Sequence, residues 1–116
     1  MLYWELNKYK EAENLHRRAI SISERILGKV HSKSVLFKLN FAQYYFITKN
    51  YHQAEKIYLS SINKLEKNKS SKLGDKIYAN EQLMNFYKST NRQEEEKKYE
   101  AIVNQLKQLK ETINSQ

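Results

Sequence analysis

One segment of this chain recurs forty-two residues later with its apolar positions kept. The stretch Tyr9-Lys10-Glu11-Ala12-Glu13-Asn14-Leu15 returns as Tyr51-His52-Gln53-Ala54-Glu55-Lys56-Ile57. The same offset relates further residues: Tyr3, Tyr45 and Tyr87, Val35 and Ile77, Phe41 and Leu83, and Ala42 and Met84. A fixed period of this length is typical of proteins that stack one supersecondary unit on the next. The repeat therefore predicts a stacked architecture.

Each repeat unit has the pattern of two helices. Apolar residues in the first half fall at spacings of three and four, which mark one face of a helix: Val35, Leu39, Ala42, Tyr45 and Phe46. After Lys49-Asn50 a second stripe follows at Tyr51, Ala54, Ile57, Tyr58, Ser61, Ile62 and Leu65. Small residues such as Ala42, Ala54 and Ser61 allow two helices to approach closely. The unit is therefore predicted to be a pair of packed helices.

The composition agrees with an all-helical protein, because the 116 residues include no Pro and only two Gly. A β-sandwich or barrel needs many tight turns and the residues that make them. The pattern predicts helices over 8–27, 32–48, 51–68, 75–89 and 92–112. Gly28 is expected to end the first helix in a left-handed conformation. Ser32 or Ser34 is expected to cap the second helix, and Asp75 the fourth.

Several strings in the chain resemble the long tetratricopeptide repeat of kinesin light chains. They are Leu2-Tyr3, Lys8-Tyr9-Lys10-Glu11-Ala12-Glu13, Arg18-Ala19-Ile20 and Leu27-Gly28-Lys29-Val30-His31. The resemblance covers 2–65 well and 77–106 weakly. It departs from the family at Ser32, where Pro is usual, and at Glu96, where a small residue is expected. The resemblance implies an all-α fold, an α-α superhelix or tetratricopeptide solenoid of about two and a half repeats.

The chain is expected to form one domain over 1–116, with repeat units over about 1–31 (partial), 32–73 and 74–116. Leu2 and Tyr3 would correspond to the last turn of a first helix whose body is missing. Helix 8–27 would then expose part of its apolar face, including Leu15 and Ile22. Arrays of this kind generally need three or more repeats for stability. The sequence therefore suggests self-association, or continuation into further repeats of a longer protein.

The formal net charge is +8, and the middle of the chain carries the excess. Residues 25–76 contain eleven Lys or Arg and three acidic residues. Two interpretations stay open: an acidic partner, or lysines that only keep the outer faces soluble. Nucleic-acid binding is disfavoured, because the lysines do not share one helical face: Lys33, Lys38, Lys49, Lys56 and Lys64.

The sequence predicts neither catalysis nor a cofactor. It contains no Cys, and His16, His31 and His52 have no metal-ligand spacing. The acidic run Glu94-Glu95-Glu96 begins the last predicted helix, where negative charge stabilises the helix dipole. No secretory signal and no membrane-length apolar run is present. We therefore expect a soluble, cytoplasmic protein that is not an enzyme, has no metal site and does not enter membranes.

The expected function is that of a protein-interaction scaffold that binds an extended peptide or partner protein. In stacked helix pairs the first helix of each pair lines the concave wall. The groove candidates are Leu36, Leu39, Asn40, Gln43, Phe46, Tyr78, Gln82, Asn85 and Lys88. The resemblance implies that Asn40 contacts peptide. Two alternatives stay open: a purely structural segment of a larger repeat array or assembly, and a basic surface that binds an acidic partner or nucleic acid.

Overall fold

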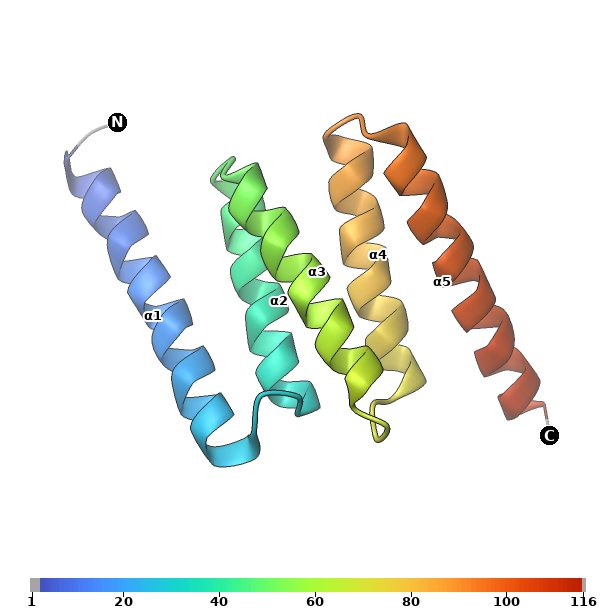
Figure 1. Cartoon of the computed structure of the whole chain (residues 1–116). Helices are drawn as coiled ribbons and strands as arrows, with labels where there is room; N and C mark the ends of the chain where they lie inside the picture. Colours follow the sequence, from blue (N-terminus) through green and yellow to red (C-terminus); the bar gives the residue numbers. More distant parts are fainter. Residues whose placement is uncertain (1–2, 116) are drawn as a thin grey trace.

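The computed structural model describes residues 3–115, which form five α-helices (Figure 1). Their bounds are α1 (Tyr3–Leu27), α2 (Ser32–Ile47), α3 (Tyr51–Lys67), α4 (Leu73–Ser89) and α5 (Gln93–Asn114). Within the described range no residue belongs to a β-strand. The predicted all-α helical-repeat fold is therefore confirmed.

The helices form two layers. Each helix contacts the next one along the chain, and α2 also contacts α4. Across residues 3–115, the backbones of the odd-numbered helices α1, α3 and α5 lie apart from one another. Side chains can still reach across, as the ion pair between Lys64 of α3 and Glu24 of α1 does. The molecule measures 56 × 38 × 19 Å, and its smallest dimension fits two layers of helices that are each about 10 Å thick. An open row results, with α2 and α4 close together on one side and α1, α3 and α5 spread apart on the other.

The core lies where α2, α3 and α4 meet. Fully buried side chains there include Val35 from α2, Tyr58 and Leu65 from α3, and Leu83 and Phe86 from α4. Burial raises the pKa of the Tyr58 hydroxyl to about 12. Ala42, Ala54 and Ser61 are fully buried as well, as their small size in the repeat predicted. The close packing of these helices therefore depends on small residues between aromatic ones.

The turns after α2 and α4 repeat each other at the forty-two-residue offset. The hydroxyls of Thr48 and Thr90 donate to carbonyls three and four residues earlier. The next residues, Lys49 and Asn91, have positive φ angles of 66° and 59°. Asn tolerates this left-handed conformation, whereas a long side chain such as Lys carries a cost of about 1–2 kcal/mol. The sequence repeat is thus also a repeat of backbone conformation.

The link from α1 to α2 follows the predicted pattern in part. Gly28 has a φ of 94°, and its N–H donates to the Glu24 carbonyl at 2.9 Å, which confirms its predicted role at the end of α1. The predicted serine cap of α2 is wrong. His31 is the cap residue, and its Nδ1 accepts from the Lys33 N–H at 3.1 Å. Ser34 is instead buried, with its Oγ 2.8 Å from the Oγ of Ser23.

The N-terminal part of α1 also differs from the prediction. The structure has one continuous helix from Tyr3, not a separate first helix followed by a turn. The repeat places Leu6 where Thr48 and Thr90 begin a turn, and Leu6 has no hydroxyl to bond back to a carbonyl. Leu6 thus lacks the hydroxyl bonds that accompany the turns at Thr48 and Thr90, and the helix continues through it. Leu2 and the side chain of Tyr3 lie outside the described residues.

The bounds of α4 and α5 differ slightly from the predicted ranges, whereas the exposure predicted for α1 agrees with the structure. Helix α4 begins at Leu73, so Asp75 lies in its first turn and does not cap it. Helix α5 continues to Asn114. The predicted exposure of apolar residues on α1 is confirmed, since Leu15 is 66% exposed and Ile22 is 41% exposed.

Candidate functional site

Two tyrosine–carboxylate pairs join the layers and fix the surfaces between them. The Tyr45 hydroxyl on α2 donates to Glu13 Oε1 on α1 at 2.7 Å. The Tyr87 hydroxyl on α4 donates to Glu55 Oε2 on α3 at 2.6 Å. Both members of the first pair precede their counterparts by forty-two residues. The same contact therefore sets how α2 sits on α1 and how α4 sits on α3.

The carboxylate of each pair also accepts a hydrogen bond from an arginine, but the two arginines are not at equivalent positions of the repeat. Arg17 donates to Glu13 at 2.8 Å from within α1, whereas Arg92 donates to Glu55 at 2.7 Å from the turn before α5. The hydrogen bond from Arg17, and then that from Tyr45, lowers the pKa of Glu13. Burial alone would raise the pKa of Glu55, but its hydrogen bonds from Tyr87 and Arg92 outweigh burial and lower it. Both carboxylates are thereby held in their ionised form.

The first candidate surface is the exposed face of α2 and α4, here called the α2/α4 wall. Six of the predicted groove residues are exposed on these two helices: Leu36, Asn40, Gln43, Tyr78, Asn85 and Lys88. Gln82 is half-buried. Because α2 and α4 contact each other, the two helices form one continuous surface.

Four amide side chains stand in register along this wall. Gln82 follows Asn40 by forty-two residues, and Asn85 follows Gln43 by the same offset. Each helix therefore presents two amides three residues apart, on one helical face. None of the four side chains forms a hydrogen bond with another of the described residues. Each keeps donors and an acceptor available to a ligand.

Two of the predicted groove residues have a different position. Leu39 is only 3% exposed and belongs to the core, so its assignment to the groove is wrong. Its spacing from Val35 and Ala42 already marked it as part of the buried stripe. Phe46 is half-buried, and its ring centroid lies 5.4 Å from that of Phe86. Phe46 thus packs α2 against α4, and only part of its ring is left at the surface.

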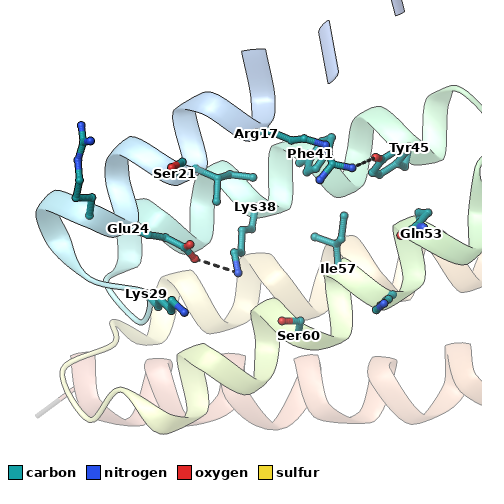
Figure 2. Close-up of a pocket in the computed structure, with 13 residues that line it drawn as sticks. Arg17, Ser21, Glu24, Lys29, Lys38, Phe41, Tyr45, Gln53, Ile57 and Ser60 are labelled. Carbon is teal, nitrogen blue, oxygen red and sulfur yellow. Dashed lines mark hydrogen bonds and ion pairs between the residues drawn. The ribbon is translucent and has the colours of Figure 1, made fainter. Parts of the chain in front are cut away.

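A second candidate surface, here called the α1/α3 groove, was not predicted. It is a cavity of about 650 Å³ between α1 and α3, with α2 as its floor (Figure 2). Its lining comprises Arg17, Ile20, Ser21, Glu24, Arg25, Lys29, Lys38, Phe41, Tyr45, Gln53, Lys56, Ile57 and Ser60. The basic residues come from α1, α2, α3 and the loop after α1. Because these residues come from different elements, the distribution of lysines around any single helix does not reveal the groove.

Comparison with known proteins supports the architecture. The family model of the tetratricopeptide repeat matches residues 1–32. The match supports a tetratricopeptide-repeat protein. Such repeats generally mediate protein–protein interactions and are generally scaffolds without catalytic activity. No match was found among curated proteins or among solved structures.

Two further features of the described residues bear on the type of site. Over residues 3–115, no three His, Cys, Asp or Glu side chains gather in a way that could hold a metal ion. The helices of this part of the chain are also not long and apolar enough to cross a membrane. Both candidate sites described above lie on the surfaces of the helices.

Proposed function

We propose that the α2/α4 wall binds an extended segment of a partner protein. The observation that carries this proposal is the set of four amides in register, none of which has a partner within the described residues. An extended peptide has backbone N–H and C=O groups that helical or sheet structure does not satisfy. Amide side chains can pair with both groups, whatever the sequence of the peptide.

Apolar and charged neighbours of the amides support the same proposal. Leu36 and Tyr78 are both 37% exposed, one on each helix, and can receive apolar side chains of the peptide. Lys88 is exposed near the C-terminal end of α4 and can pair with an acidic residue. The chain would thus act as an interaction scaffold whose specificity comes from the residues around the amides.

The proposal predicts that Asn40→Ala combined with Asn85→Ala weakens peptide binding. Peptides selected from a displayed library of random twelve-residue sequences would serve as probes, with affinities measured by isothermal titration calorimetry. Each lost hydrogen bond contributes about 1 kcal/mol, so the two substitutions should weaken binding about tenfold to thirtyfold. Helicity measured by circular dichroism should stay unchanged, because both side chains are exposed.

The matched control is Asn63→Ala combined with Asn104→Ala, which removes two exposed amides from α3 and α5. These helices lie in the other layer, so the control should bind the selected peptides as the parent does. Equal affinities for the parent, the double variant and the control would remove the α2/α4 wall from the binding site.

We also propose that the repeat belongs to the long, kinesin-light-chain-like subclass. The forty-two-residue period and the Leu27-Gly28-Lys29-Val30-His31 link support this assignment. In the structure Gly28 ends α1 and His31 caps α2, so both residues of the link have a structural role.

A second candidate function is that of a structural segment in a larger assembly. The apolar side of α1 favours it, since Leu15 and Ile26 are 66% and 70% exposed. A helix of another repeat or another molecule could cover this side. The peptide selection separates the two functions, because a purely structural segment would yield no peptide whose binding depends on Asn40 and Asn85.

A further inference from the structure

The α1/α3 groove lies in the layer opposite the α2/α4 wall and has a different chemistry. Figure 2 shows Lys38 from α2 and Ile57 from α3 pointing into the space between α1 and α3. Its floor is apolar, because Ile20 and Ile57 are partly buried against the core beside Phe41. A groove of about 650 Å³ is within the range that accommodates a ligand or several side chains of a peptide.

Positive charge surrounds this apolar floor. Five basic side chains and a single carboxylate line the groove. Arg25, Lys29 and Lys56 form no ion pair with any carboxylate of residues 3–115. The rim therefore carries positive charge that the described part of the chain leaves unneutralised.

The single carboxylate is shared between two lysines. Glu24 Oε2 lies 3.1 Å from Lys38 Nζ and 3.7 Å from Lys64 Nζ (Figure 2 shows the shorter contact). All three side chains are about four-fifths buried. Burial, together with the neighbouring Lys38, lowers the pKa of Lys64 to about 8. An additional anion near this end of the groove would relieve the excess of positive charge.

The repeat itself provides a comparison. The six charged groove residues have these counterparts forty-two residues later: Leu59, Glu66, Lys67, Ser71, Asn80 and Lys98. The counterpart of the uncharged Gln53 is the acidic Glu95. That equivalent set holds two basic and two acidic residues, so its formal charge is zero. The positive charge is thus a property of the α1/α3 groove and not of the repeat in general.

We propose that the α1/α3 groove binds an acidic segment of a partner protein, with carboxylates at the basic rim and an apolar side chain on the floor. Charge complementarity would steer the encounter, and the apolar floor would hold the bound segment. A protein partner is favoured over single-stranded nucleic acid, which is bound by stacking of bases on exposed aromatic rings. The aromatic residues here, Phe41 and Tyr45, are only 5% and 6% exposed.

A subtractive peptide selection tests the proposal. Random twelve-residue peptides displayed on phage would be selected on the parent chain, after removal of those that bind the variant Arg25→Ala combined with Lys56→Ala. The surviving peptides should be rich in Asp and Glu and should contain apolar residues. Synthetic versions of these peptides should bind the Arg25→Ala, Lys56→Ala variant, here called the groove variant, at least tenfold more weakly than the parent.

The matched control is Lys67→Ala combined with Lys98→Ala, which changes the two positions forty-two residues later and alters net charge by the same amount. Binding within twofold of the parent is expected for this control, and for the Asn40→Ala, Asn85→Ala variant of the α2/α4 wall. Equal losses in the groove variant and the lysine control would overturn the proposal, because overall charge would then explain binding. A twelve-nucleotide single strand that loses affinity only in the groove variant would overturn it in favour of nucleic acid.

Discussion

Replacing Phe86 by Ala is expected to lower the free energy of unfolding by about 4 kcal/mol. The Phe86 side chain is 1% exposed. Its ring centroid lies 5.4 Å from that of Phe46, 5.7 Å from that of Tyr58 and 5.5 Å from that of Tyr87. These rings come from α2, α3 and α4, so the substitution leaves a cavity where three helices meet. Urea denaturation followed by circular dichroism measures the loss.

The repeat supplies the control for this prediction. Tyr44 stands forty-two residues before Phe86, but it is half-buried and its hydroxyl donates to the Tyr9 carbonyl at 2.8 Å. Its ring packs beside that of His16 on α1. Because solvent can reach the vacated space, Tyr44→Ala should cost at most about 2 kcal/mol. Equal losses at the two positions would mean that the core does not lie among α2, α3 and α4.

Ala54→Trp is expected to unfold the chain or to lower its stability by about 3 kcal/mol or more. Ala54 is fully buried at the start of α3, among the core residues of neighbouring helices. An indole cannot occupy a contact sized for a methyl group without moving the helices apart. Thermal denaturation followed by circular dichroism tests this effect.

The corresponding control is His52→Trp, which places the same indole at an exposed position two residues earlier on α3. Its melting temperature should stay within a few degrees of that of the parent, since exposed substitutions usually change stability little. If Ala54→Trp melted at the same temperature as this control, Ala54 would have to lie on the surface.

The helices could be predicted from the sequence because their apolar spacing is local. Val35, Ala42 and Tyr58 are buried as their spacing requires, and Gly28 ends α1 as its freedom at positive φ allows. Cap residues were harder to predict, because several polar residues stand near each helix start. His31 caps α2 although Ser32 and Ser34 were the better candidates by preference alone.

The surfaces depend on contacts between helices, and the spacing within one helix does not reveal these. The sequence predicts Leu39 as a groove residue, yet it belongs to the buried stripe. The basic α1/α3 groove combines Arg25, Lys38 and Lys56 from three different helices. The hydrogen bond from Tyr87 to Glu55 could have been inferred only after α3 and α4 had been placed side by side.

The central claim is that the chain stacks its helices in a forty-two-residue register, so that equivalent residues make equivalent contacts. Paired double-mutant cycles test it directly: Tyr45→Phe with Glu13→Ala across α1 and α2, and Tyr87→Phe with Glu55→Ala across α3 and α4. The register predicts a favourable coupling energy of about 1 kcal/mol in each cycle, measured by urea denaturation. A coupling energy of zero in either cycle would contradict it.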